Sequence, residues 1–434
     1  MRARMGKRPM AAALDDLRVL DLSGPIGHYA GRLLADLGAD VIKVEPPGGD
    51  AARTYAPYLP DVDAPENGLQ FLLLNANKRG VTIDPSHDRG RELLLRLIES
   101  ADVLIESWRP QEAAALGLSV SDLEAAKPEL IHASLTGWGL SGPRAQWAYA
   151  DIVGLAMSGV MTLAGFADGP PEQLPDLQGF HCASIDATAG IMAAVLHRDA
   201  TGEGQLVEVS MQEALSMAQE TAMQEADING NDRVRDAGGA LGFTIPGLGL
   251  YECADGYVYL MVAGLAGAGF QGLVDLMAST DEAGDLTEEP YATFIRESMN
   301  RALLTQLATD PSGLGDLLAK LAHIQEVVVA FMFKHPKEYL YEEAQARRVL
   351  AGMVSTPEDI SINKQLAGRG WWREIEDAGR GKTLRYPGPP WQFEGTPATL
   401  RRAAPLLGEH NQEIFGELGL STDEIGALAT EGAI

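Results

Sequence analysis

The stretch LRVLDLSGPIGHYAGRLLADLGADVIKVE, residues 17–45, decides the fold of this chain. Leu17–Ser23 is a run of Leu and Val side chains typical of a buried strand, and Gly24-Pro25 ends it. Apolar residues then recur at helical spacing over His28–Leu37, and Ala39–Glu45 has the composition of a second buried strand. A strand, a helix and a strand in immediate succession indicate a βαβ unit with parallel strands.

The alternation continues along the chain. We expect strands at Val81–Ile83, Asp102–Glu106, Leu130–Ser134 and Leu206–Ser210, and helices at Arg89–Glu99, Val120–Ala126, Ala187–Leu196 and Met211 to about Ala226. Strands that alternate with helices predict a parallel, Rossmann-like sheet whose ligand crevice lies at the carboxyl ends of the strands. After a Gly- and Asp-rich linker at Asn229–Pro246, Leu248–Cys253 and Tyr257–Val262 predict a hairpin. The chain becomes loop-rich from Thr356.

The charge balance excludes some classes of partner. The 434 residues contain 34 Lys and Arg against 61 Asp and Glu, for a formal net charge of −27. A surface this negative repels phosphate backbones and anionic lipid, so we expect no nucleic-acid binding. The charge does not exclude a small polyanion, because a few cations and backbone N–H groups can hold phosphates locally.

Several common sites are also not indicated. The only cysteines are Cys182 and Cys253, which gives no disulfide framework and fits a reducing cytoplasm. The eight histidines are scattered, so no metal site is predicted. The phosphate loop, the dinucleotide fingerprint and the serine-nucleophile elbow are missing. Glycines interrupt the longest uncharged run, Gly256–Val274, and no membrane span is predicted.

Six segments together carry a resemblance that none carries alone. They are LLADLGADVIKVEPPGGD (Leu33–Asp50), LNANKRGVTID (Leu74–Asp84), ESWRP (Glu106–Pro110), SLTGWGLSGP (Ser134–Pro143), LHRDATGEGQLVEVSMQEA (Leu196–Ala214) and RRAAPLLGEHNQEIFGELGL (Arg401–Leu420). In this order and spacing they closely resemble the class III CoA-transferase family, the CaiB/BaiF group, over nearly the whole chain. That family also contains 2-methylacyl-CoA racemases.

The resemblance implies an α/β fold with a large Rossmann-like lobe made from both chain ends, a smaller α+β lobe, and two protomers interlocked as a dimer with the active site between them. We assign residues 1–228 to the first part of the large lobe, 229–350 to the small lobe, and 351–434 to a return segment that completes the large lobe.

The implied activity is transfer of CoA from an acyl-CoA to a carboxylic acid. A family Asp attacks the thioester, forming an anhydride and then an aspartyl-CoA thioester, before the second acid takes the CoA. CoA thioesters are therefore expected as substrates, with no permanently bound cofactor.

This chain departs from the family at the nucleophile. Two family anchors, matched by Gly165–Pro171 and Ala193–Arg198, need no gap between them and place Phe180 where the family has Asp. A phenyl ring cannot form an anhydride. Racemization is also disfavoured, because Ala150 occupies the position of the racemase His.

Three interpretations follow. In one, Asp186 at the start of a helix replaces the nucleophile, stabilised by the helix dipole, in a self-sufficient CoA-transferase or acyl-CoA isomerase; otherwise Asp186 caps that helix. In the second, which we favour, the chain is the nucleophile-free subunit of a two-subunit enzyme similar to succinyl-CoA:benzylsuccinate CoA-transferase, paired with an Asp-bearing homologue. In the third, it is a non-catalytic CoA-binding homologue.

The resemblance also implies a set of CoA contacts. The matching residues are Gly24, Pro25 and Ile26; Leu74, Asn75, Asn77 and Lys78; Ser107, Trp108 and Arg109; and Trp138 and Gly139. Lys78 and Arg109 are the expected phosphate partners, and the alternative for both is a solvated or salt-bridged surface. Two family arginines are replaced, by Pro46 and Ala115.

Overall fold

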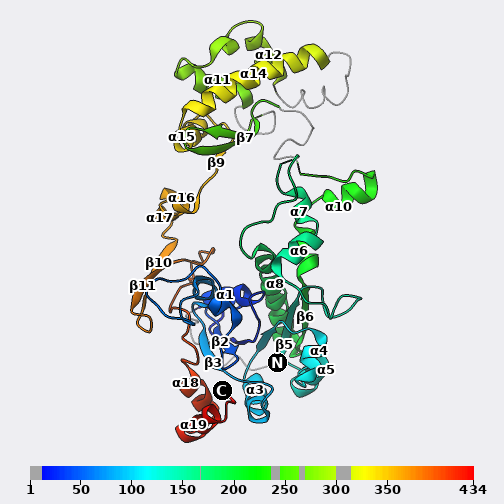
Figure 1. Cartoon of the computed structure of the whole chain (residues 1–434), viewed down its shortest axis with the longest axis vertical. Coiled ribbons are helices and arrows are strands. Elements are labelled where there is room, and N and C mark those ends of the chain that lie inside the picture. The colour runs from blue at the N-terminus through cyan, green and yellow to red at the C-terminus, as the bar shows by residue number, and fades with distance from the viewer. Residues whose placement is uncertain (1–11, 167, 236–244, 263–268, 300–313) are drawn as a thin grey trace. The chain divides into compact units, whose positions relative to one another are not determined.

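The computed structural model describes residues 12–166, 168–235, 245–262, 269–299 and 314–434, and the chain forms two compact units (Figure 1). Unit 1 comprises the chain up to Met161, Gln173–Asp232 and Lys364–Ile434; unit 2 comprises Thr162–Glu172 and Arg233–Asn363. Unit 1 is thus built from both ends of the chain. The sequence places the corresponding boundaries after residues 228 and 350.

Unit 1 contains a six-stranded, fully parallel sheet in the order β3-β2-β1-β4-β5-β6. The strands are β1 (Arg18–Asp21), β2 (Asp40–Glu45), β3 (Arg79–Thr82), β4 (Val103–Glu106), β5 (Ile131–Thr136) and β6 (Gln205–Ser210). This is the doubly wound order of Rossmann-like proteins. The predicted α/β class with a parallel sheet is confirmed.

Helices cover both faces of this sheet (Figure 1). Apolar side chains of α1 (His28–Asp36), α8 (Gln178–Thr201) and α9 (Met211–Met217) pack on one face, while α3 (Asp88–Glu99), α5 (Val120–Ala126), α18 (Asn411–Glu417) and α19 (Thr422–Thr430) pack on the other. Because both faces are buried, β1 and β2 carry consecutive apolar residues rather than an alternating pattern. The remaining helical segments of unit 1 are short: Ala51–Thr54, α2 (Leu69–Asn75), α4 (Pro110–Ala115), α6 (Asp151–Met157), α10 (Ala222–Gln224), a π-helical turn Glu225–Asn229, and α17 (Lys364–Gly368); α7 (Val160–Leu163) lies at the boundary with unit 2.

Two predicted helices differ from the structure. The helix expected at Ala187–Leu196 is the central part of α8, which begins earlier, at Gln178. The helix expected from Met211 to about Ala226 ends at Met217, because Glu220 adopts a left-handed backbone conformation with φ 56°. By length and composition α8 could cross a membrane, and half of its most apolar window is buried within the fold.

The return segment is more ordered than the sequence predicts. A hairpin of β10 (Trp372–Asp377) and β11 (Lys382–Pro387) replaces the expected loop. Arg380 in its turn donates to Glu66 Oε2 at 2.8 Å, and Arg53 donates to the same oxygen at 2.8 Å. Both guanidinium groups are buried, so this bridge ties the return segment to the N-terminal part of unit 1.

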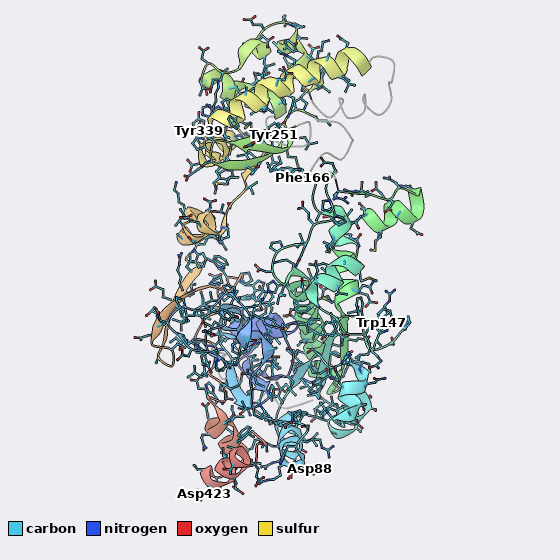
Figure 2. The ribbon with its side chains drawn as sticks, viewed as in Figure 1. Asp88, Trp147, Phe166, Tyr251, Tyr339 and Asp423 are labelled. Carbon is cyan, nitrogen blue, oxygen red and sulfur yellow. The ribbon has the colours of Figure 1, made fainter. Side chains whose placement is uncertain are left out.

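Unit 2 has its own core around a three-stranded antiparallel sheet. The predicted hairpin is present as β7 (Leu248–Cys253) and β8 (Gly256–Met261), and β9 (Ala351–Met353) completes the sheet. The helices are α11 (Gly269–Ser279), Gly284–Thr287, α12 (Tyr291–Ser298), α14 (Leu314–Lys334), α15 (Lys337–Ala346) and α16 (Pro357–Ser361). Tyr251 on β7, labelled in Figure 2, donates its hydroxyl to Gln325 on α14 at 2.7 Å.

Candidate active site

Three of the four predicted CoA-contact segments follow neighbouring strands at their carboxyl ends. Gly24–Ile26 follow β1, Ser107–Arg109 follow β4, and Trp138-Gly139 follow β5. Gly24 N–H donates to Ser107 Oγ at 2.8 Å, which joins the first two segments. The structure therefore brings these residues to one edge of the sheet, where doubly wound folds bind their ligands.

Phe180 lies at the same edge, in the first turn of α8. Its ring is buried and contacts Tyr149 edge to face, with the ring centroids 6.4 Å apart. The Tyr149 hydroxyl donates to the backbone oxygen of Ser107 at 3.0 Å, and Ser184 Oγ in the next turn of α8 donates to Ile26 O at 2.6 Å. At the position where the sequence analysis expects the family nucleophile, the structure thus has an apolar packing residue beside the predicted CoA segments.

The position predicted for Asp186 is wrong. Because α8 begins at Gln178 and not near Ala187, Asp186 lies in the third turn and its side chain is exposed. The favourable field of a helix N-terminus falls off within the first turn, so α8 does not stabilise this carboxylate, and Asp186 does not cap the helix either.

A different carboxylate, which the sequence analysis did not single out, lies at the start of α8. Asp151 is buried, and its Oδ1 accepts a hydrogen bond from Phe180 N–H at 2.9 Å. Its Oδ2 is buried without a hydrogen-bond partner among the described residues. Burial raises the pKa of Asp151, against the lowering effect of the Phe180 and Gly179 backbone N–H groups. In the sequence analysis, this segment was represented only by the neighbouring Ala150, at the position of the racemase His.

Arg109 keeps a position open to solvent. Its guanidinium pairs with Glu112 in the first turn of α4, which raises the pKa of Arg109, and Nη1 donates to Gln146 O at 3.2 Å. Trp108 N–H donates to Glu106 Oε2 at 2.6 Å, and Gly139, with φ 84°, donates to Thr136 Oγ1 at 2.9 Å. Arg109 is therefore salt-bridged at the surface and still accessible to a ligand.

The fourth predicted segment is structural in this chain. Leu74, Asn75, Asn77 and Lys78 are all buried. Lys78 Nζ uses its three donors inside the protein, on Asp21 Oδ2 at 2.6 Å, Asn75 Oδ1 at 2.8 Å and His28 O at 2.9 Å. Burial lowers the pKa of Lys78 to about 8, although Asp21 opposes this shift. The expectation that Lys78 contacts a phosphate does not fit this geometry, since no donor of its ammonium group is left.

Asn77 likewise serves the fold. Its backbone is left-handed, with φ 69°, and its Oδ1 accepts from the backbone N–H groups of Arg401 at 2.5 Å and Arg402 at 3.2 Å. Its amide nitrogen donates to Asp36 and to Thr399 O. Asn77 thereby fixes the return segment against α1. Within the described residues, no group of three His, Cys, Asp or Glu side chains could hold a metal ion.

Comparison with known proteins decides the family. The sequence model of CoA-transferase family III matches residues 14–411. This chain belongs to that family. Among curated relatives, the succinyl-CoA:(R)-benzylsuccinate CoA-transferase subunit BbsE of Thauera aromatica is 33% identical, over 96% of this chain and 97% of its own length. The formyl-CoA:oxalate CoA-transferase of Streptomyces avermitilis is 31% identical, over 98% and 100%.

The solved structures agree. A CaiB/BaiF family protein from Brucella suis superposes with a TM-score of 0.77 at 26% identity, over 94% of this chain and all of that one. The predicted family resemblance is confirmed, and CoA thioesters are the substrates of this family of transferases.

We expect Lys78→Met to destabilise the protein by about 3–5 kcal/mol, because it leaves Asp21 as a buried carboxylate without its cation. Urea unfolding measures this loss. Arg109→Gln, on an exposed side chain, should leave the unfolding midpoint unchanged and weaken CoA binding. Normal stability with weakened CoA binding in Lys78→Met would instead assign Lys78 to a phosphate.

We expect Asp151→Ala to cost about 1–2 kcal/mol of unfolding free energy, since the first turn of α8 loses its acceptor. Asp151→Asn keeps that acceptor and should be close to wild type. Because the pKa of Asp151 is raised in the folded state, the free energy of unfolding of the wild type falls as the pH rises past the pKa that Asp151 has in the unfolded chain. Asp151→Asn should remove this part of the pH dependence. Equal losses in both variants would show that the carboxylate itself is needed.

Proposed function

We propose that this chain is the nucleophile-free subunit of an acyl-CoA:carboxylic acid CoA-transferase, which works with a homologous chain that carries Asp at the position of Phe180. The observation that carries the proposal is Phe180 itself, a buried phenyl ring in the first turn of α8. The relative BbsE is named as a subunit of its enzyme, which supports a two-chain assembly.

The division of labour follows from the residues present. The partner's Asp would attack the acyl thioester, giving an acyl anhydride and CoA thiolate; the thiolate would then displace the first acid and form the aspartyl-CoA thioester. This chain would contribute Gly24–Ile26, Ser107–Arg109 and Trp138-Gly139 to a CoA pocket. Arg109 is the cation in these segments that stays accessible to a phosphate. Trp147, labelled in Figure 2, is exposed on the loop that follows β5 and is the next residue after Gln146, whose backbone oxygen accepts from Arg109.

Succinyl-CoA is the proposed CoA donor, because BbsE and a succinyl-CoA:mesaconate CoA-transferase of Haloarcula hispanica, 32% identical over 94% of this chain and 97% of its own length, are both named for it. The acceptor is a carboxylic acid. We place the enzyme in the cytoplasm, where the free thiols of Cys182 and Cys253 stay reduced.

The surface of unit 1 supports an intimate protein partner. α8 is mainly apolar, and Ile185 and Leu196 on it are 51% and 70% exposed. Ile152 and Val153 on the neighbouring α6 are also exposed. Several exposed apolar side chains on neighbouring helices mark an interaction surface. An interlocked dimer, either with the Asp-bearing homologue or with a second copy, would cover them.

We expect the purified chain to be inactive alone and active when co-purified with its nearest encoded Asp-bearing paralogue. The assay is CoA transfer from succinyl-CoA to a panel of carboxylic acids. Activity of the chain alone would overturn the proposal. No activity in either preparation, with CoA binding by calorimetry, would identify a non-catalytic CoA-binding homologue instead.

We expect Phe180→Asp to give the chain alone measurable CoA transfer, because it restores a carboxylate beside the predicted CoA segments. Phe180→Asn is the matched control, because Asn is nearly equal in size to Asp but is neutral and unable to form an anhydride. The double variant F180D D186N should keep the gained activity, since Asp186 lies in an exposed turn away from the helix start. Activity that depends on Asp186 would favour the self-sufficient enzyme.

A further inference from the structure

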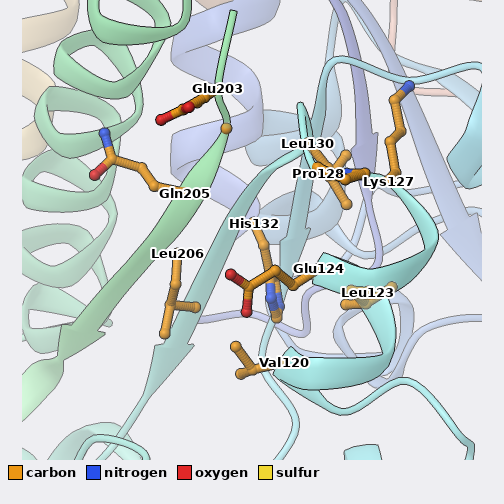
Figure 3. Close-up of a pocket in the computed structure, with 11 residues that line it drawn as sticks. Val120, Leu123, Glu124, Lys127, Pro128, Leu130, His132, Glu203, Gln205 and Leu206 are labelled. Carbon is orange, nitrogen blue, oxygen red and sulfur yellow. The ribbon is translucent and has the colours of Figure 1, made fainter. Parts of the chain in front are cut away.

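A pocket of about 380 Å³ lies between α5 and the edge of the sheet at β5 and β6, within unit 1 (Figure 3). Its apolar lining consists of Val120, Leu123, Pro128, Leu130 and Leu206. The pocket lies beside the start of β5 and β6, where Leu130 and Leu206 are, whereas the predicted CoA segments follow the opposite, carboxyl ends of the strands. The volume is within the range of small-molecule sites. The pocket is therefore distinct from the candidate active site.

His132 is the buried polar residue of this pocket. Its side chain is more than nine-tenths buried, and Figure 3 shows its ring among Leu123, Glu124 and Val120. Its Nε2 lies 3.1 Å from Glu106 Oε1, a carboxylate oxygen that can only accept, so Nε2 donates. In the part of the chain that the structure describes, His132 Nδ1 is buried with no hydrogen-bond partner. A buried nitrogen in this state is costly unless a ligand group bonds to it.

The charge at the mouth indicates the sign of the ligand. Glu124 and Glu203 line the pocket, are exposed, and form no ion pair with any described residue. Lys127 also lines it, but its ammonium group donates to the backbone oxygens of Glu99, at 2.8 Å, and Ala101. These neutral acceptors leave the charge of Lys127 in place, so the mouth carries two carboxylates against one ammonium group and is net negative. A carboxylate or phosphate is disfavoured here, while an ammonium group is attracted and can donate to His132 Nδ1 once binding opens that buried atom to the pocket.

We propose that this pocket binds a small organic amine with an apolar, aromatic or branched body, and that His132 and Glu106 connect its occupancy to the segment Ser107–Arg109. Glu106 is buried, and its two oxygens contact His132 Nε2 and Trp108 N–H. An amine bound to His132 therefore affects the backbone that follows β4, because the Glu106 carboxylate contacts both His132 and Trp108 N–H. The site is independent of whether the chain has a nucleophile.

Calorimetry on the full chain tests the binding, with benzylamine, benzyl alcohol and benzoate as probes of equal shape. We expect benzylamine to bind about tenfold more tightly than benzoate, because the two carboxylates at the mouth outweigh the single ammonium group of Lys127. The double variant E124Q E203Q should reduce this preference, and Glu92→Gln, an exposed acid on α3, should not. Equal affinity for the three probes, or no binding of any, would overturn the proposal.

Filling the pocket tests its location. Leu206→Trp places a large side chain in it from the exposed edge strand, and benzylamine binding should fall more than about tenfold. Leu95→Trp is the matched control, since Leu95 on α3 is 37% exposed against 36% for Leu206. Unchanged binding in Leu206→Trp would place the amine elsewhere and overturn the site.

Amide hydrogen exchange tests the connection to the Ser107–Arg109 segment without using CoA or a partner. Benzylamine should slow exchange of the Trp108 amide in the wild type and in Leu95→Trp, and should have no effect in Leu206→Trp. Binding with unchanged Trp108 exchange would overturn the link through Glu106. Because neither measurement involves transferase activity, failure here is distinguishable from failure of the proposed function.

Discussion

The buried ion pair between Arg53 and Glu45 is the interaction on which unit 1 depends. Glu45 ends β2, and Arg53 meets its carboxylate with two nitrogens, at 2.7 and 2.8 Å. The same guanidinium stacks over Phe71 at 3.9 Å and reaches Glu66, which in turn accepts from Arg380 in the return segment. A buried charge is tolerated only when it is paired and hydrogen-bonded, so removing any one of these four charged side chains would leave a buried charge without its partner and destabilise unit 1. The two ends of the chain are thereby joined at the end of one strand.

The same requirement explains why so many cations of this acidic protein are unavailable to a ligand. Lys43 pairs with Asp50 inside the fold, and Lys78 pairs with Asp21 below the first turn of α1. Both ammonium groups are completely buried, so withdrawing either from its carboxylate to meet a phosphate would leave a buried charge uncompensated. Cations that could meet a CoA phosphate must therefore come from exposed positions after the strands, as Arg109 does.

The sequence predicted those features that local pattern determines. The strands of the parallel sheet and the βαβ order are encoded in apolar runs and glycine turns, and they are present. The start of α8 was missed because the group that caps it, Asp151, is distant in sequence and its contact exists only after folding. The role of Lys78 was misjudged for a related reason. A lysine after a short helix looks the same whether its ammonium group faces solvent or a carboxylate on another strand, and only tertiary structure separates the two.

The surroundings of Phe180 favour an apolar side chain over a carboxylate. The position is buried beside Tyr149, and Asp151 already occupies the N–H groups of this first turn. A second carboxylate there would be desolvated and repelled by Asp151, and both effects disfavour its ionised form. A phenyl ring avoids that cost and gains an edge-to-face contact with Tyr149, so the fold is more stable with Phe at this position than with a carboxylate. In the two-chain enzyme proposed above, this chain would keep its CoA segments at the sheet edge. Its partner would then bear the cost of the buried carboxylate.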